Sequence, residues 1–504
     1  MAVTVLEPAG RVTLSWDAVE ELSVRVAADL LGRGVDPGSR VAVVGDTGLS
    51  SVVLAAAARC AGLEICFLGP ADAPAGVVAG MADRLRRLGA DVVIGPGADL
   101  PAFAPEAGGH RIAVEDLGSR PPRTAGPALR NGAPERHRLL QFTSGTTADP
   151  RRITLEPAAV TANLDAIGAR LGLTAGDSIF CWLPLNHDLG LVGSLLLAAH
   201  LRCELTLCAP RVFLGQPSRW AEWLAAARPT YLPAPNSGWS LLLSRAGARH
   251  AAPMRAALSS VRSAVTGGEP VDPGLCAQLV EGPRALVPAG AVVPAYGLAE
   301  ATLAVTVAAP GDPVRTAPVP GTGTGTAPVV SVGAALAGTS VTIRGDDGPL
   351  PDGEVGEIVV RGRSLAREYA DLPTGLATGD EGFMLGTELF VTGRRKDLIK
   401  VNGRRVFPHE IERAAESSGV ARPGRTVAFS VPARPAERVV LLVEVADRAG
   451  CGGEQGMDLV RRQVQRDLGV RLDVVAAVER GSIPKTTSGK LQRRLARERW
   501  LVSR

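Results

Sequence analysis

The chain has 504 residues, of which 46% are hydrophobic, 4% aromatic and 21% charged, with a formal net charge of +4. This length favours more than one domain, and the apolar fraction is sufficient for packed cores. Because aromatic residues are few and no basic run is interleaved with them, the sequence gives no support to nucleic-acid binding.

The cysteines and the N-terminus indicate the compartment. Seven cysteines occur without a C-x-x-C pair, and the six histidines lack metal-ligand spacing, a pattern typical of free thiols in a reducing environment. The N-terminus has no basic start followed by an apolar run, and the longest apolar stretch, near Leu189–Leu201, is too short to span a bilayer. We expect a soluble cytoplasmic protein with no role in a membrane.

Helical and strand patterns alternate from the N-terminus to about residue 300. Residues 16–34 have apolar positions at helical spacing, and a turn leads from there into an apolar strand at Arg40–Gly45. A second pair follows, a helix at Ser50–Ala61 and a strand near Leu63–Leu68. This alternation predicts parallel α/β layers. The Pro-, Gly- and Arg-rich stretch 101–136 is expected to be a surface connection.

The pattern changes after residue 320. Short β-type runs up to residue 360 predict a small antiparallel sheet or barrel. From residue 397 the sequence predicts a compact unit with helices at Pro408–Ser418 and Met457–Leu468 and strands at Arg425–Pro432, Arg438–Val445 and Asp473–Val478. The predicted fold is a large N-terminal domain of parallel α/β layers plus a small β-barrel-like part, followed by a small α+β C-terminal domain.

Lysine is rare in this chain. Of 55 basic residues only Lys396, Lys400, Lys485 and Lys490 are lysines. An ammonium group is a compact charge on a flexible stem, which a planar guanidinium does not replace. The last two lysines frame the stretch Pro-Lys-Thr-Thr-Ser-Gly-Lys, where Ser-Gly is typical of a mobile loop that can approach phosphate. We interpret Lys490 as a catalytic cation.

The first motif with chemical potential is Leu-Gln-Phe-Thr-Ser-Gly-Thr-Thr at residues 140–147, followed by Arg151 and Arg152. Hydroxyl groups and backbone amides around a glycine turn can wrap a polyphosphate, and arginine adds charge. It is not the P-loop, because G-x-x-x-x-G-K-[ST] is absent. An ordinary Ser/Thr-rich turn is the alternative, but the strand pattern at Arg138–Phe142 just before it favours phosphate binding.

Further motifs follow along the chain. Residues 182–190 place His187 after a proline-broken segment, where it could gate a pocket or simply be a loop histidine with its hydrogen bonds satisfied. Residues 266–270 and 296–302 offer an aromatic face for adenine and a carboxylate, Glu300, suited to Mg²⁺. Residues 378–380 and 392–397 offer Asp380 as an acceptor for ribose hydroxyls. The tract Gly321–Gly325 mimics a nucleotide loop, but no amphipathic helix follows it, and we interpret it as a flexible loop.

In this order the motifs resemble the adenylate-forming superfamily, which includes acyl-CoA synthetases, luciferases and the adenylation domains of peptide synthetases. The resemblance covers roughly residues 12–500. Within the superfamily the sequence is most similar to the fatty acyl-AMP ligases. The similarity lies in the amino-acid sequences of residues 140–147, 182–188, 234–236, 296–303 and 403–408. In the last of these segments CoA-forming members usually have Gly-Glu-Asn where this chain has Gly-Arg-Arg.

The resemblance implies two half-reactions. ATP and a carboxylic acid form an acyl-adenylate and pyrophosphate, and the phosphopantetheine thiol of an acyl carrier protein then takes the acyl group. It implies that Lys490 and His187 are catalytic residues, that Glu300 binds Mg²⁺, and that Lys396 is a hinge. A core domain of residues 1–395 would bind ATP and carboxylate, and residues 396–504 would form a mobile lid. Nucleotide-binding residues would be Thr143, Ser144, Gly145, Thr146, Thr147, Gly268, Glu269, Tyr296, Gly297, Thr302, Asp380 and Arg394.

The sequence also departs from the family pattern. The family's phosphate loop usually continues Gly-x-Pro-Lys-Gly, whereas residues 148–152 read Ala-Asp-Pro-Arg-Arg. The insertion expected after residue 303, which the family links to rejection of CoA, is short, so CoA is an alternative acceptor. Trp239 would reshape the acyl pocket, so a specialised carboxylate from secondary metabolism fits as well as a fatty acid. A homologue that binds nucleotide without adenylating is a further alternative, which the intact Glu300, Asp380 and Lys490 oppose.

Overall fold

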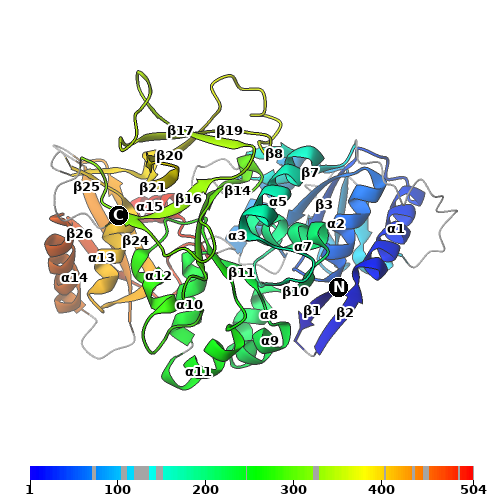
Figure 1. The fold of residues 1–504 in the computed structure, drawn as a ribbon, viewed down its shortest axis with the longest axis horizontal. Helices are drawn as coiled ribbons and strands as arrows, with labels where there is room; N and C mark the ends of the chain where they lie inside the picture. Colours follow the sequence, from blue (N-terminus) through cyan, green and yellow to red (C-terminus); the bar gives the residue numbers. More distant parts are fainter. Residues whose placement is uncertain are drawn as a thin grey trace.

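The protein is described here by a computed structural model, which places residues 1–8, 10–70, 75–103, 110–118, 136–143, 151–245, 247–321, 328–401, 404–433, 437–446, 453–485 and 489–502. Its N-terminal elements lie at one end of the molecule and its C-terminal elements at the other, with the green and yellow segments between them (Figure 1).

A mainly parallel sheet forms the N-terminal end. Its order is β6-β5-β3-β4-β7-β8, parallel except for the antiparallel pair β7–β8. The strands are β3 (Arg40–Val44), β4 (Glu64–Leu68), β5 (Val92–Gly95), β6 (His110–Ala113), β7 (Arg138–Phe142) and β8 (Arg152–Leu155), and the helices of this region are α1 (Trp16–Gly32), α2 (Leu49–Ala61) and α3 (Ala75–Leu88). Strand β6 lies inside the stretch expected to be only a surface connection, so that expectation was wrong for these four residues.

A second parallel sheet lies beside the first. In the described residues its order is β2-β1-β10-β9-β11-β12-β13, parallel except for the hairpin β1–β2. Its strands are β1 (Ala2–Glu7), β2 (Gly10–Ser15), β9 (Ser178–Cys181), β10 (Glu204–Cys208), β11 (Tyr231–Ala234), β12 (Ser263–Thr266) and β13 (Val292–Gly297). The helices between them are α5 (Pro157–Leu171), α6 (Asp188–Gly190), a π-helical stretch (Leu191–Leu196), α7 (Leu197–Leu201), α8 (Pro210–Gly215), α9 (Trp220–Ala227), α10 (Asn236–Arg245), α11 (Gly247–Ala257) and α12 (Pro273–Val280).

Strand β13 continues into an antiparallel part, in the order β14-β16-β21-β20-β19-β17-β18 with β15 beside β16. These strands are β14 (Ala304–Val307), β15 (Thr316–Ala317), β16 (Val329–Ala335), β17 (Thr339–Gly345), β18 (Gly348–Pro349), β19 (Gly356–Gly362), β20 (Leu376–Leu385) and β21 (Glu388–Arg394). The antiparallel part predicted from the β-type runs is therefore confirmed. The Gly/Thr tract at 322–325 lies outside the described residues.

The last part of the chain has cores of its own. After β21 come β22 (Ile399–Val401), β23 (Arg404–Val406), α13 (Pro408–Ser417), β24 (Ala421–Val431), β25 (Arg438–Val445), α14 (Gly453–Leu468), β26 (Val474–Val478) and α15 (Arg493–Val502). Two apolar clusters fill this unit, and their fully buried members all lie between Ile399 and Ala496. We call it the C-terminal unit. It occupies the orange and red end of the molecule (Figure 1), and the predicted mixed α/β architecture is confirmed.

No helix in the described part of the chain is long and apolar enough to cross a membrane.

Candidate active site

The sequence motifs lie where strands of the two parallel sheets end. Residue 143 follows β7, the segment from 182 follows β9, and Asn236 follows β11. The loop Thr266–Pro270 follows β12, and Tyr296 and Gly297 close β13. Loops at the carboxyl ends of parallel strands form the binding crevice of open α/β sheets. The fold therefore brings motifs that are far apart in the sequence to one face.

The two ends of the phosphate-loop motif are joined. The backbone N–H of Thr143 donates to the carbonyl of Arg151 at 2.9 Å, and the Thr143 Oγ1 accepts from the N–H of Arg151 at 3.2 Å. Strands β7 and β8 on either side pair in antiparallel fashion. The loop thus begins and ends at fixed points. Ser144, Gly145, Thr146 and Thr147, which were predicted to hold phosphates, lie outside the described residues.

Tyr296, Asp380 and Arg394 form a polar group in which the tyrosine and the aspartate are buried and the arginine is half-buried. The Tyr296 hydroxyl donates to Asp380 Oδ2 at 2.8 Å, and Arg394 Nε donates to Asp380 Oδ1 at 3.0 Å. Asp380 and Arg394 are register partners on β20 and β21. Burial raises the pKa of the Asp380 carboxyl, although the Arg394 guanidinium lowers it. The group holds the Asp380 carboxylate in a fixed orientation beside the Tyr296 ring.

The charges of Asp380 and Arg394 act on the carboxyl of Glu300. It is in the short 3₁₀ helix Ala299–Ala301, and burial raises the pKa of its carboxyl, with Asp188 and Asp380 adding to the rise and Arg394 opposing it. The described residues contain no cluster of three or more metal-ligating side chains. Mg²⁺ in nucleotide sites is held by one or two carboxylates together with substrate phosphates. Glu300 therefore fits an Mg²⁺ that arrives with ATP.

The backbone around Thr302 is tightly constrained. Thr302 has a φ of +69°, is fully buried, and donates its hydroxyl to the carbonyl of Ser364 at 2.6 Å. A β-carbon on Gly297 would stand 1.7 Å from the carbonyl oxygen of Leu303, so only glycine is possible there. A left-handed φ at a β-branched residue is strained and is tolerated where the surrounding structure enforces it. The segment is a rigid edge of the site.

Asn236 fixes the loop Thr266–Pro270. Its amide Nδ2 donates to the carbonyl of Pro270, and its Oδ1 accepts from the Thr266 hydroxyl at 3.0 Å. One side chain thus holds both ends of the loop. Glu269 in the same loop accepts at 3.1 Å from the N–H of Ser237, the residue after Asn236. Gly268, at the top of the loop, has a φ of +74°.

Lys490 reaches this loop from the C-terminal unit. A β-carbon on Gly268 would stand 3.2 Å from Lys490 Nζ, so the ammonium group lies directly over the glycine. The segment that carries it is closed at its base, because Lys485 and Leu491 form an antiparallel bridge and the N–H of Gln492 donates to the carbonyl of Pro484 at 2.9 Å. The lysine interpreted as a catalytic cation therefore lies against the loop Thr266–Pro270.

The carboxylate of Asp188 interacts electrostatically with both His187 and Lys490. Its Oδ1 is 2.7 Å from His187 Nδ1. Burial alone would raise the pKa of the Asp188 carboxyl, but His187 and Lys490 lower it to about 2. His187 was predicted to be at the mouth of an acyl pocket. In the structure His187 is the N-cap residue of α6. It is half-buried, and the Asp188 carboxylate is its partner.

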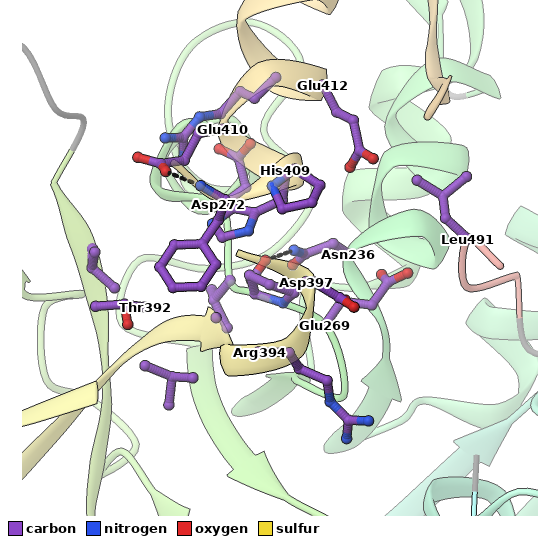
Figure 2. A pocket seen from close by; sticks show the side chains of 18 of the residues that line it. Asn236, Glu269, Asp272, Thr392, Arg394, Asp397, His409, Glu410, Glu412 and Leu491 are labelled. Atoms are coloured by element: carbon purple, nitrogen blue, oxygen red, sulfur yellow. Dashed lines mark hydrogen bonds between the residues drawn. The ribbon is translucent and has the colours of Figure 1, made fainter. Parts of the chain in front are cut away.

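We call the strands and helices up to β21 the larger part of the molecule. A cavity of about 670 Å³ lies between its loops and the C-terminal unit. Figure 2 shows its lining side chains, which come from both sides. The larger part contributes Asn236, Glu269, Asp272 and Arg394, and the C-terminal unit contributes Asp397, His409, Glu410, Glu412, Lys485, Lys490 and Arg493. His187, Tyr296, Asp380 and Glu300 are not among its described lining residues.

The predicted hinge is connected to the base of the lysine loop. Lys396 lies exposed in the 3₁₀ turn Arg395–Asp397, on the single connection between β21 and β22. Its neighbour Asp397 is 3.9 Å from Arg493, which also donates two hydrogen bonds to Glu412 on α13, at 2.9 and 2.7 Å. Bidentate arginine–carboxylate pairs fix geometry as well as charge. Arg493 therefore ties the turn, the helix and the Lys490 loop into one body.

Sequence reasoning missed three of these residues. Asp188 follows His187 in the motif at residues 182–190, where only the histidine was given a role. Arg493 is three positions after Lys490, and no sequence pattern distinguished it from the many other arginines. Asn236 was considered only as part of the segment 234–236, which resembles the fatty acyl-AMP ligases. Trp239 is fully buried in an aromatic core and donates its indole N–H to the carbonyl of Val265 at 3.2 Å, so it does not line the described cavity.

A family model of AMP-binding enzymes matches residues 2–370. The chain belongs to the AMP-binding enzyme family. Long-chain-fatty-acid–AMP ligase FadD26 of Mycobacterium marinum is 30% identical to it, over 97% of this chain and 91% of that one. A 4-hydroxyphenylalkanoate adenylyltransferase from the same organism is 31% identical, over 97% of this chain and 86% of its own.

Solved structures agree with this placement. A structure from work on fatty acyl-adenylate ligases from E. coli and L. pneumophila covers 100% of this chain and 95% of that chain, with a TM-score of 0.86 and 26% identity. This AMP-binding enzyme is therefore an acyl-adenylate ligase close to the fatty acyl-AMP ligases, and the resemblance inferred from the motifs is confirmed.

Proposed function

We propose that this ligase converts a carboxylic acid and ATP to an acyl-adenylate and pyrophosphate, and then transfers the acyl group to the phosphopantetheine thiol of an acyl carrier protein in secondary metabolism. The observation that carries the proposal is the position of Lys490, whose ammonium group lies over Gly268 at the edge of the site that contains Asp188 and Glu300. This is the arrangement expected for adenylation.

The first half-reaction needs positive charge near the α-phosphate. A carboxylate oxygen attacks the α-phosphorus, a new oxygen–phosphorus bond forms, and pyrophosphate leaves with the electrons of the broken bond. Negative charge grows on the oxygens during this step, and cations held in place before the reaction stabilise it. Lys490 is the cation we assign to this role. Asp380 and Arg394 would orient the ribose, and Tyr296 would contact adenine.

Bound Mg²⁺ would shield the phosphate charges, and Glu300 is the residue we assign to hold it. Thr143 and Arg151 would anchor the ends of the phosphate loop. The short bridging hydrogen bonds between these two residues support that role, because they keep the loop closed at its base.

The second half-reaction needs space where Lys490 now lies. The thiol sulfur attacks the acyl carbon, the bond from that carbon to the AMP oxygen breaks, and the thiol proton is lost. We propose that the C-terminal unit turns about Lys396 to admit the phosphopantetheine arm. The separate apolar clusters of this unit support such a movement, because they allow it to turn as one body.

The first experiment measures pyrophosphate release with ATP, Mg²⁺ and a broad panel of carboxylic acids, with hydroxylamine to trap the adenylate. We expect release that depends on the acid and is lost in Lys490→Ala. Nucleotide binding by calorimetry without release for any acid would favour a homologue that binds nucleotide but does not adenylate, and would overturn the proposal.

A second experiment separates the acceptors. Acyl transfer is measured with CoA and with a phosphopantetheine-loaded carrier protein at equal thiol concentration. The proposal expects transfer to the carrier protein only. Equal or faster transfer to CoA would identify an acyl-CoA ligase, the alternative that the short segment after residue 303 favours.

A further inference from the structure

Glu269 is held in place by the larger part of the molecule. Its Oε2 accepts a 3.1 Å hydrogen bond from the N–H of Ser237 in the first turn of α10. The N-terminal end of a helix carries a partial positive charge that stabilises a carboxylate. Asn236 fixes the loop on both sides of Glu269. The carboxylate is therefore in position whether or not the C-terminal unit is docked on it.

Two cations of the C-terminal unit, Lys485 and Arg493, line the same cavity as Glu269. Burial and the neighbouring Arg425 lower the pKa of the Lys485 ammonium, and Glu269 opposes this shift together with Glu416 and Glu444. Burial would also lower the pKa of Arg493, but Glu412, Asp397 and Glu269 together raise it. A carboxylate of the larger part thus attracts both cations.

Both cations lie at the base of the segment that carries Lys490. Lys485 pairs with Leu491 at the base of the lysine loop, and Arg493 begins α15 just after it. On the same loop, a β-carbon on Gly489 would stand 3.3 Å from the hydroxyl of Ser237. Any force that draws Lys485 and Arg493 toward Glu269 therefore also brings Lys490 over Gly268.

We infer that Glu269 is a positioning residue that holds the C-terminal unit closed for adenylation, by attracting Lys485 and Arg493, and is not a ligand of the nucleotide. The inference rests on the proposed function for its catalytic meaning. It replaces the nucleotide-binding role that the sequence motif implied for Glu269.

The chemistry of the two roles differs clearly. A carboxylate beside ATP phosphates meets like charge, which disfavours binding unless a metal lies between them. A half-buried carboxylate facing two cations gains from their charge. Exposed or half-buried pairs of this kind contribute about 1 kcal/mol or less. A modest attraction suits a contact that must break in every catalytic cycle.

A cross-linking test measures closure without using activity. A β-carbon on Gly489 would stand 4.0 Å from the β-carbon of Ser237, within the range of roughly 3.5–4.5 Å found in disulfides. Ser237→Cys with Gly489→Cys should therefore form a disulfide only when the unit is closed. The strain of a side chain at Gly489, whose φ is +90°, is the same in every variant compared. Cysteines of the described chain are buried and free, and Cys451→Ser removes the remaining thiol. The disulfide rate is compared with and without Glu269→Gln.

We expect Glu269→Gln to slow disulfide formation at least fivefold, since about fivefold matches the loss of one partly exposed charge interaction and Glu269 attracts two cations. Lys485→Met should slow it less, because Arg493 remains, and the double variant should add little to the effect of Glu269→Gln, because both changes remove the same interaction with Lys485. Glu64→Gln is the matched control. It removes a half-buried pair with Arg40 in the N-terminal sheet, and it should leave the disulfide rate unchanged.

Activity then gives an independent result. In Glu269→Gln without added cysteines, pyrophosphate release should fall while transfer from supplied acyl-adenylate is retained. An unchanged disulfide rate with a raised KM for ATP would identify a nucleotide ligand and overturn the inference. Equal loss of both half-reactions would also overturn it. If the disulfide rate depends on Glu269 but the wild type releases no pyrophosphate, the closing role stands and the proposed function fails.

Discussion

The ammonium nitrogen of Lys490 lies 3.2 Å from the point where a β-carbon on Gly268 would stand. A residue with a side chain at position 268 would therefore displace the lysine. Its backbone would also be strained, because the φ of Gly268 is +74°.

Gly268→Ala should reduce pyrophosphate release by at least tenfold while the fold is kept. Gly282→Ala is a matched control, because Gly282 has a φ of +76° and nothing within 4 Å of the added carbon. Both variants should lose about 1 kcal/mol of stability from the left-handed backbone, measured by denaturant unfolding. Equal activity in the two alanine variants would mean that contact with Lys490 is unimportant.

Lys490→Ala should separate the two half-reactions. Removing a cation that stabilises developing charge costs on the order of 10²–10³ in rate, so adenylate formation should fall by about that factor. Transfer from chemically prepared acyl-adenylate to the acceptor thiol should fall much less, because the proposed rotation removes the lysine from the site before that step. Single-turnover measurements of each half-reaction test this. Equal loss in both would contradict rotation of the C-terminal unit.

Tyr296→Phe should raise the KM for ATP with a smaller effect on kcat. The change keeps the ring but removes the donor to Asp380 Oδ2, leaving Arg394 as the remaining partner of that carboxylate. Loss of one buried hydrogen bond should also cost about 1–3 kcal/mol of stability. Tyr231→Phe, at another buried tyrosine, is the control for the loss of a buried hydroxyl. An unchanged KM for ATP would remove Tyr296 and Asp380 from ribose binding.

Glu416 should make stability depend on pH. Burial raises the pKa of its carboxyl from the ordinary 4.5 to about 7, against hydrogen bonds from the N–H of Gly424 and the hydroxyl of Thr426, which lower it. The folded protein therefore binds a proton that the unfolded chain releases. The stability from this group is complete below pH 4.5 and is lost as the pH rises to about 7.

Glu416→Gln keeps an acceptor for both hydrogen bonds and removes the ionisation. Relative to wild type it should be more stable at pH 8 than at pH 5, by on the order of 2 kcal/mol. The free energy of unfolding at the two pH values measures this difference, and Glu354→Gln, at an exposed carboxylate, should show none. The same stability difference at both pH values would mean that Glu416 ionises normally.

Local pattern predicted most of the regular elements. Strand β25 has the predicted bounds Arg438–Val445, and α13 ends one residue before the predicted helix. Strand β24 begins at Ala421, four residues earlier than predicted, because a bulge extends its pairing with β25. Strand β6 was missed, since it is an edge strand with two exposed residues in a Pro- and Gly-rich stretch. Its formation depends on pairing with β5, which no local pattern records.

The sequence by itself determined the class of protein and the residue types of the site, because each motif is a short run whose spacing and chemistry are local. Only the tertiary structure decided which groups meet. The Tyr296 hydroxyl donates to Asp380, which is 84 positions away, Lys490 lies over Gly268, and Glu269 lines one cavity together with Lys485 and Arg493. These contacts join separate segments, so their distances and charges follow from packing. The role of Glu269 depends on that packing, because a carboxylate is a ligand or a docking group according to which charges surround it.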